Sequence, residues 1–324
     1  MKKVLKAIGW LALAVVVIAA SAAAYLQLFM PNVGPAPDLK VEITPQRIEH
    51  GAYLANHVVV CMDCHSARDF SKFSGPLQSG TLGRGGEKFS KEFGFPGTFF
   101  ARNITPASLA DWTDGEIYRV ITTGVTRHGK AVFPVMPYKY YSMMDPEDVK
   151  DIIAYLRSIP AIENQVPHSK ADFPFNFILN TIPKKAETAP RPDTADHIAY
   201  GRYLTHIAGC MECHTPNDDK GQKVKGMELA GGWEMSVGGG KIVTTANLTP
   251  DKETGLGSWT SSDFIAKFKM YADSSYTPPT VKPGEFQTIM PWTMYANMKT
   301  SDLAAIYAYL QSVPAVHNPI TKFK

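Results

Sequence analysis

The chain has 324 residues, of which 44% are hydrophobic and 19% charged, so it can bury the core of one or two domains and has room for at most one membrane span. Three lysines in the first six residues supply the whole net charge of +3. The remaining basic and acidic side chains balance and form no basic stripe, which excludes nucleic-acid binding. Four cysteines are too few for a disulfide framework in a chain of this length.

The N-terminus carries an uncharged apolar stretch over residues 7–30. As a helix, this stretch is long enough to cross a bilayer core of about 30 Å, so we predict a membrane anchor helix over residues 1–30. A cleaved signal peptide is the alternative, because the small residues at 20–24 resemble a signal-peptidase site. Either way the rest of the chain is exported, to the periplasmic side of the bacterial cytoplasmic membrane if it is anchored and to the soluble periplasm if the helix is cleaved.

Four prolines between residues 31 and 46 predict a stiff tether. Folded structure is expected to begin near Arg47. Beyond this point the chain contains two copies of one sequence unit, which is the strongest organisational signal it carries.

The repeat begins with GAYL at 51–54 leading into CMDCH at 61–65, and with GRYL at 201–204 leading into CMECH at 210–214. The second copy is one residue shorter between its glycine and its first cysteine. Further matched segments are NITP at 103–106 with NLTP at 247–250, WT at 112–113 with WT at 259–260, MPY at 136–138 with MPW at 290–292, and AYL at 154–156 with AYL at 308–310.

We therefore predict two homologous domains, over residues 47–164 and 197–324, joined by a proline-rich linker over residues 165–196. The apolar stretch 173–182 in this linker is expected to lie along a domain surface or in the seam between the domains. The expected fold class is all-α, as two tandem domains with long loops after the N-terminal hydrophobic helix.

The last helix of each unit shows the clearest local signals. Asp145 is the predicted N-cap of the first, since Pro146 follows it and apolar residues recur at helical spacing. In the second unit, Thr300 or Ser301 is the predicted cap. The glycine-rich stretches in the middle of each unit are expected to be loops, with a short hairpin possible, because they lack the strand and helix of a nucleotide cradle.

A Cys-x-x-Cys-His run is the attachment signature of c-type haem, whose vinyl groups the two thiols capture as thioethers while the histidine binds the iron. Zinc would require further soft ligands near each pair, and a redox dithiol would require a βαβ pattern, and neither is present. We therefore expect two covalently bound haem c groups. Cys61, Cys64 and His65 would hold the first, and Cys210, Cys213 and His214 the second.

Methionine is the usual sixth ligand of such an iron when the reduction potential is high. Met136 and Met290 are the predicted ligands, because they recur at the same place in the repeat and each precedes a proline that fixes the backbone. A second recurring pair, Met144 and Met298, is expected to be core.

Other recurring polar residues leave alternatives open. His57 and His206, each four residues before a cysteine motif, would either bond a haem propionate or lie in solvent. The Asn-x-Thr-Pro segments are expected to be structural turns whose side-chain donors could bond propionates. Arg102 would be either a propionate partner or a surface residue, and His128 a loop residue.

In combination these motifs resemble the cytochrome c domains in multihaem subunits of membrane-bound alcohol, aldehyde and gluconate dehydrogenases. Those subunits carry three haem domains, whereas this chain has two. The resemblance covers both units, and it implies a haem protein of an electron-transfer chain.

An iron held by histidine and methionine has no open coordination position, so it exchanges electrons and does not readily bind peroxide. We predict a dihaem cytochrome c that passes single electrons from a respiratory dehydrogenase or quinol-oxidising complex to a terminal oxidase or a soluble carrier such as a small cytochrome. It would have no catalytic residues and would not itself be an enzyme, although it could be the electron-transfer subunit of an oxidoreductase complex. A dihaem redox enzyme such as a peroxidase is the main alternative, and a structural subunit is a weaker one.

Overall fold

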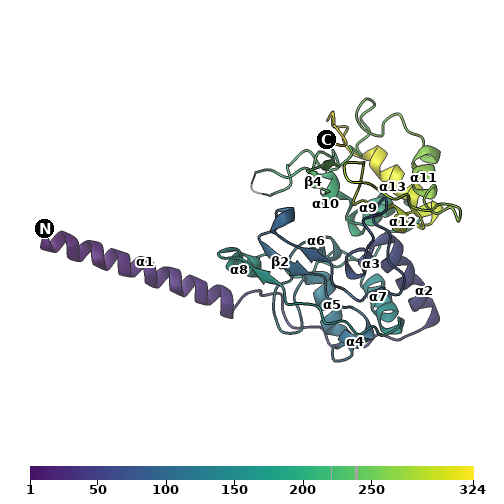
Figure 1. Ribbon diagram of the computed structural model, residues 1–324. Helices are drawn as coiled ribbons and strands as arrows, with labels where there is room; N and C mark the ends of the chain where they lie inside the picture. The colour runs from purple at the N-terminus through teal and green to yellow at the C-terminus, as the bar shows by residue number, and fades with distance from the viewer. Residues whose placement is uncertain (220, 238–239) are drawn as a thin grey trace.

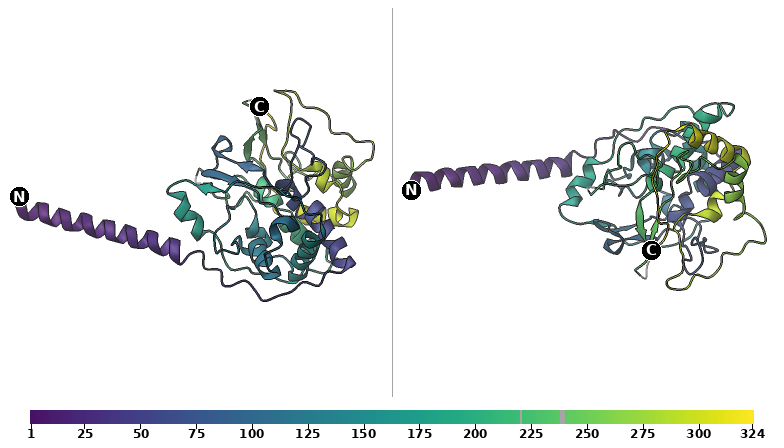
Figure 2. Two further views of the ribbon diagram at one scale, coloured as in Figure 1. Left: turned by 60° about the horizontal axis from the view of Figure 1, so that its bottom comes forward. Right: turned by 90° about the horizontal axis from the view of Figure 1, so that it is seen from above.

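The computed structural model describes residues 1–219, 221–237 and 240–324 (Figure 1). Helix α1 (Lys2–Leu28) projects as a single rod from a body that holds the remaining elements, and two further views agree (Figure 2). The body is mainly helical, which confirms the expected class at this level. It also contains short antiparallel strands, so "all-α" describes it incompletely. We call residues 31–164 the first half and residues 197–324 the second half.

In the first half, helix α2 (Pro45–Tyr53) runs on as a π-helical turn, η1 (Leu54–Val58), and then as α3 (Cys61–His65). Helix α7 (Pro146–Ser158) packs across α2. Their backbones meet at Gly51, where an added Cβ would lie 1.8 Å from the carbonyl oxygen of Asp151. The crossing therefore requires glycine.

The second half repeats this arrangement with α9 (His197–Ile207), α10 (Cys210–His214) and α13 (Thr300–Ser312). Here a Cβ on Gly201 would lie 1.9 Å from the carbonyl oxygen of Ala305. The glycine of each Gly-x-Tyr-Leu segment thus has the same role, which is to let two helices cross at backbone contact.

The one-residue difference between the copies is absorbed by η1, because a π turn holds one more residue than an α turn. The residue before each cysteine helix is left-handed at matched positions, with φ +49° at Val60 and +67° at Gly209. The two copies therefore enter their cysteine helices with the same backbone turn.

Asp145 caps α7 as predicted, since its Oδ1 accepts the Glu147 N–H at 2.8 Å. The cap predicted for the matching helix is wrong. Helix α13 starts at Thr300, its N-cap is Lys299, and no side chain caps it. Thr300 and Ser301 lie inside the first turn, where a hydroxyl cannot reach forward to a free N–H.

The repeated Trp-Thr pair marks the start of a middle helix in each half. Helix α5 (Asp114–Thr123) begins with a capping box between Thr113 and Glu116, and α11 (Ser261–Lys269) with one between Thr260 and Asp263. Further short helices in the two halves are α4 (Pro106–Leu109), α6 (Tyr138–Tyr141), α12 (Trp292–Tyr295) and the 3-10 turn η2 (Lys91–Phe93).

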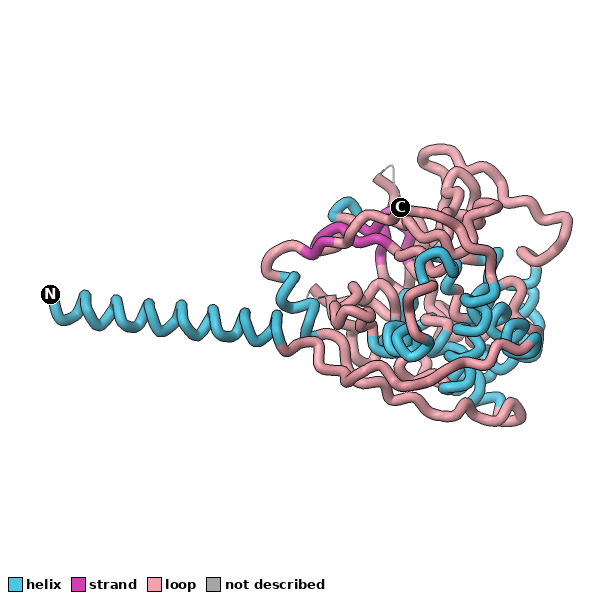
Figure 3. Tube along the Cα trace, turned by 90° about the horizontal axis from the view of Figure 1, so that it is seen from below, coloured by secondary structure: helices cyan, strands magenta, loops and turns pink. Residues whose placement is uncertain are grey.

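The strands are short and antiparallel (Figure 3). One sheet has the order β1-β2-β3, from β1 (Lys88–Phe89), β2 (Gly97–Phe100) and β3 (Lys170–Ala171), with Phe89 opposite Phe99 and Gly97 opposite Ala171. The predicted hairpin is formed by β4 (Glu234–Ser236) and β5 (Ile242–Thr244).

Strand β3 attaches the linker to the first half, and α8 (Phe175–Ile178) and η3 (Leu179–Thr181) follow it. The Phe175 ring lies 5.8 Å from that of Phe133. Of the two positions expected for the apolar linker stretch, the structure adopts the surface of the first half, beside the C-terminal end of α1.

Residues 31–44 form no helix or strand, but they are not a free tether. Val41 is 5% exposed, and its N–H donates to Asp114 Oδ2 at 2.8 Å. Ordered packing thus begins before Arg47. Buried side chains of both halves, including Val58, Met62, Leu204 and Met298, join in one core cluster.

Candidate functional site

Helices α3 and α10 each carry two thiols that form no disulfide and are half-buried. Burial raises the pKa of Cys61, Cys210 and Cys213 to about 12, and raises that of Cys64 as well. The thiols are thus protonated at neutral pH, unlike the low-pKa cysteines of redox dithiols. Uncharged paired thiols beside a histidine fit thioether attachment of haem.

The histidine of each motif is oriented by a backbone carbonyl. His65 Nδ1 lies 2.6 Å from the Arg102 carbonyl oxygen, and His214 Nδ1 lies 2.7 Å from that of Ala246. A nitrogen facing a carbonyl carries the proton and donates it, so Nε2 keeps the lone pair that a metal requires. Burial also lowers the pKa of both imidazoles, which favours the neutral, ligating form.

These carbonyls are placed by the Asn-x-Thr-Pro segments, which are structural turns as predicted. Asn103 Oδ1 accepts the Thr105 N–H at 2.9 Å, and its Nδ2 donates to the Ile162 carbonyl at 2.8 Å. Because this amide is committed to the backbone, the suggested propionate bond from Asn103 is not supported. The second copy repeats both bonds, from Asn247 to Thr249 and Val316.

A loop glycine hydrogen-bonds to the backbone carbonyl of each motif histidine. The N–H of Gly85 donates to the His65 carbonyl at 2.8 Å, and that of Gly231 donates to the His214 carbonyl at 2.7 Å. Both glycines have positive φ, and a Cβ on either would come within 2.5 Å of backbone atoms. The glycine-rich stretches are loops that hold the motifs, in line with the prediction.

The Met-Pro segments form matched turns in the two halves. Met136 and Met290 are half-buried, and the carbonyl of each accepts the N–H of the residue two positions on at 2.8 Å. Met144 and Met298 are 0% and 1% exposed in the core, as expected.

The short helix after each Met-Pro segment ends in a tyrosine, which hydrogen-bonds to the chain just before the cysteine motif of the same half. Tyr141 Oη donates to the Val59 carbonyl at 3.4 Å, and Tyr295 Oη donates to the Ala208 carbonyl at 2.7 Å. Each accepting carbonyl lies two residues before a first cysteine. These bonds connect the short helix after each Met-Pro segment to the chain just before the Cys-x-x-Cys-His helix of the same half.

A loop of the first half holds the methionine segment of the second. Ser74 Oγ donates to the Met290 carbonyl at 2.6 Å and accepts the Trp292 N–H at 3.0 Å. The Ser74 N–H donates to Gln287 Oε1 at 2.9 Å, and Ser74 is buried with φ +65°. Sequence reasoning missed this contact, which lies outside the repeat pattern.

The acidic residue inside each motif is paired. Asp63 forms an ion pair with the buried Arg68 at 2.9 Å, and Glu212 forms one with Lys223 at 3.6 Å. Burial raises the pKa of Cys213, with smaller contributions that include the negative charges of Glu212 and Asp63. Asp63 belongs to the other half, so its charge acts on the Cys213 thiol across the seam.

The remaining candidates have other partners. His57 Nδ1 donates to the Met294 carbonyl of the second half at 3.1 Å, and His206 Nδ1 donates to the Arg202 carbonyl of its own helix at 2.8 Å. Arg102 donates to the linker carbonyls of Val166 and Pro167, so of the two alternatives for Arg102 the surface residue is favoured over the propionate partner. His128 is an exposed loop residue, as predicted.

A cluster of His50, Asp148 and Asp151 has metal-like composition, with ligand atoms within 4.8 Å of one another. Its carboxylates are neutralised by Arg191, at 2.8 Å from Asp148, and by Arg47, at 2.5 Å from Asp151. We assign it a structural role.

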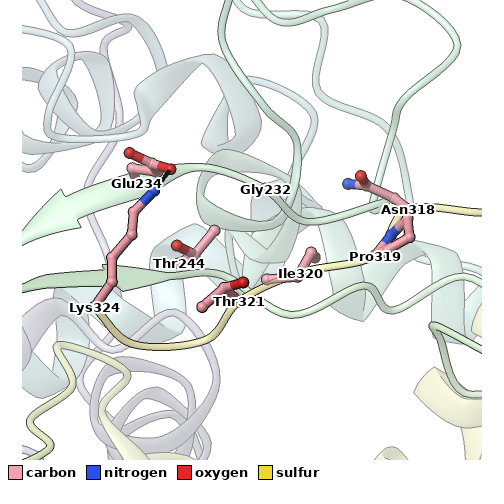
Figure 4. A pocket seen from close by; sticks show the side chains of 8 residues that line it. All are labelled: Gly232, Glu234, Thr244, Asn318, Pro319, Ile320, Thr321 and Lys324. Atoms are coloured by element: carbon pink, nitrogen blue, oxygen red, sulfur yellow. Dashed lines mark hydrogen bonds and ion pairs between the residues drawn. The ribbon is translucent and has the colours of Figure 1, made fainter.

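A cavity of about 300 Å³ lies between the β4-β5 hairpin and the C-terminal segment (Figure 4). Lys324 Nζ and Glu234 Oε1 pair there at 2.6 Å. The lining contains no cysteine, histidine or methionine and is separate from the cysteine motifs.

A family model described as cytochrome c matches residues 198–314. Over 267 residues the chain is 32% identical to a protein named diheme cytochrome c-type from Cereibacter sphaeroides, a match that covers 79% of this chain and 82% of that relative. The chain belongs to the cytochrome c family. Membership implies covalently bound haem c, for which the thiols and oriented imidazoles described above are suited.

Two further relatives of this cytochrome are subunits of dehydrogenases. The cytochrome c subunit of alcohol dehydrogenase (quinone) from Gluconacetobacter polyoxogenes is 27% identical over 312 residues, or 91% of this chain and 61% of the subunit. The gluconate 2-dehydrogenase cytochrome c subunit from Pantoea cypripedii is 26% identical over 285 residues, or 83% and 60%. The chain thus spans about three fifths of the length of these two relatives, and the resemblance drawn from the motifs is confirmed.

Proposed function

We propose that this cytochrome binds two haem c groups, in tandem domains over residues 47–164 and 197–324, and transfers single electrons between redox proteins. The observation that supports the proposal is the duplication of one set of donor residues. Each half has a thiol pair, a histidine held by a carbonyl, and a Met-Pro turn followed by a tyrosine that bonds to the chain just before its own cysteine motif. A protein that binds one haem would not require a second set of the same donor residues.

The thiols of each motif would form the thioether bonds, and the histidine Nε2 and the methionine sulfur would take the two axial positions. Haem c, when bound, takes up and releases one electron at a time. The set for the first haem is Cys61, Cys64, His65 and Met136, and for the second it is Cys210, Cys213, His214 and Met290.

The side chains would favour a carrier over a catalyst. Carbonyl partners at Nδ1 hold each imidazole neutral and fixed in orientation. Each Met-Pro turn is fixed by a backbone hydrogen bond, and its thioether would close the last ligand position. A dihaem peroxidase would need one such position to open.

The names of the relatives support partners of the dehydrogenase kind. We infer that a dehydrogenase or quinol-oxidising complex donates electrons and that a terminal oxidase or a small cytochrome accepts them. Helix α1 contains a stretch with a mean hydropathy of 2.3, and none of its residues is fully buried, which suits an uncleaved anchor that holds the protein at the periplasmic side of the cytoplasmic membrane.

The test is to count haem in the purified protein and in paired variants. Absorbance of the alkaline pyridine adduct should give two haems per chain. It should give one in the double variant Cys61→Ala/Cys64→Ala and one in the matched variant Cys210→Ala/Cys213→Ala. One haem in the unaltered protein would refute the dihaem proposal.

Ligand binding separates the carrier from the peroxidase. The ferrous protein should bind no carbon monoxide, and the ferric protein should show no high-spin change with peroxide. Binding of either at one haem would favour the enzyme. Co-purification of the protein from its native membrane would identify the donor and acceptor.

A further inference from the structure

The linker of this cytochrome contacts helix α1 near the C-terminal end of that helix. Asn180 Nδ2, in η3, donates to the Leu26 carbonyl of α1 at 3.1 Å. Within α1, Ala23 and Leu26 are half-buried and the other residues are exposed, so one short stripe of the helix is covered. Figures 1 and 2 show α8 on the side of the body that faces the end of α1.

If α1 spans the bilayer as proposed, this contact lies at the level of the outer membrane surface. Counted from Ala7, the first residue after the last N-terminal lysine, the roughly 20 helical residues that cross a bilayer core end at Leu26. The rings of Tyr25 and Phe29 stack at 5.5 Å at this end of the helix. Aromatic side chains gather at the boundary between hydrocarbon and headgroups, which agrees with this level.

At this level the linker exposes large apolar side chains. Phe173 is 82% exposed and Ile178 is 49% exposed, and the Phe177 ring lies 6.2 Å from that of Phe173. Exposing such side chains to water is unfavourable by about 25 cal/mol per Å² of apolar surface. Lys184 and Lys185 follow and are exposed, where they can meet anionic headgroups.

Contacts with the first half fix the position of this segment, with its apolar side chains exposed. Strand β3 pairs with β2 just before them, and the Phe175 ring packs on Phe133 of the first half. The segment therefore cannot bury Phe173 by folding back without breaking these contacts.

We propose that residues 173–179 lie in the interfacial layer of the bilayer beside the outer end of α1, with lipid covering their apolar face. The inference rests on the uncleaved anchor of the proposed function. Lipid is the occupant because the patch is continuous with the span and lies at its outer boundary. Two attachments, α1 and this segment, then fix which side of the first half faces the membrane.

The experiment uses full-length holoprotein in liposomes of phosphatidylethanolamine and phosphatidylglycerol. Single cysteines are introduced as Phe173→Cys and, separately, Ile178→Cys, and each is treated with a charged, membrane-impermeant maleimide. The matched control is Met270→Cys, since Met270 is 52% exposed and lies at the end of α11 in the second half. We expect labelling at 173 and 178 to be lost in liposomes while labelling at 270 proceeds.

A second measurement needs no substitution. The unaltered protein in liposomes that contain a photoactivatable phosphatidylcholine should give lipid adducts on the peptide that contains residues 173–178. Equal maleimide labelling at 173 and 270, with no adduct on this peptide, would overturn the inference and leave a protein partner to cover the patch. The mass of the native protein separates the two proposals: loss of residues 1–30 overturns the anchor, whereas an intact chain with free labelling at 173 overturns only the interfacial segment.

Discussion

Tyr53 in α2 donates a hydrogen bond to Asp302 in α13 across the seam, with 2.5 Å between Oη and Oδ2. The matched tyrosine of the other copy, Tyr203, donates to Asp148 in α7, also at 2.5 Å. The two bonds exchange partners between the halves, as in the interface of a symmetric dimer. Each Oη also accepts a backbone N–H at the start of the helix that it meets.

Loss of either hydroxyl should destabilise the whole protein. Burial and the facing carboxylate raise the pKa of both phenols, so both stay protonated and donate. Tyr53→Phe leaves the buried Asp302 short of a donor, which should lower the free energy of unfolding by about 1–3 kcal/mol. Tyr203→Phe should do the same at Asp148. Urea denaturation measures both.

A double-mutant cycle provides the control for this prediction. Tyr53→Phe combined with Asp302→Asn should cost less than the sum of the two single changes, because the residues are in direct contact. Fully additive effects, or an unchanged denaturation midpoint in Tyr53→Phe, would contradict a stabilising role for the seam.

Removing a proposed methionine ligand should change one site only. Met136→Ala should leave both haems attached but create one high-spin centre of lower potential, because the thioether that favours reduction is lost. Met290→Ala should do the same at the second site. Visible spectra and a redox titration measure the change. The matched control is Met144→Leu, a core substitution that should leave the spectra unaltered; unchanged spectra in Met136→Ala would remove the assignment.

Ser74 should act on the second site from the first half. Ser74→Ala removes the hydroxyl that links the Met290 carbonyl to the Trp292 N–H, so the methionine turn loses support worth about 1–3 kcal/mol. We expect one redox transition to shift and the charge-transfer band of the methionine-ligated ferric haem to weaken at that site. Ser71→Ala is the control, since its hydroxyl donates to Asp69 in an exposed position. Equal effects of the two changes would argue against cross-half positioning.

Stability should fall in mild acid, with His57 as one cause. Burial lowers the pKa of His57 from its ordinary 6.5. The unfolded chain therefore binds more protons than the folded one, and the free energy of unfolding declines as the pH drops below about 6.5. His57→Gln should reduce this decline in urea titrations at successive pH values. His128→Gln, at an exposed loop position, should not.

The repeat made much of this fold predictable, because matched residues imply matched helices. The α7 cap at Asp145, the core position of Met144 and the turn at Asn103 all follow from local side-chain chemistry. Where local signals were ambiguous the prediction failed. Thr300 and Ser301 are good capping residues in isolation, but α13 starts at the first of them.

The contacts that orient the site were not predictable, because they use backbone atoms or join the halves. The Arg102 carbonyl that holds His65 has no side-chain signature, and any residue could supply it. The carbonyl bonded by Ser74 also carries no residue-specific signal, and it lies 216 positions away. The sequence shows that the first copy has one extra residue, but only the structure shows that the π turn η1 accommodates it.

The exchange of partners at the seam also makes the two halves depend on one another. Tyr53 bonds to Asp302 and Tyr203 to Asp148, so each half relies on the other for the phenol that satisfies its buried carboxylate. A chain truncated after residue 196 would leave Asp148 without the Tyr203 donor, and we expect such a fragment to be markedly less stable than the same residues within the intact protein.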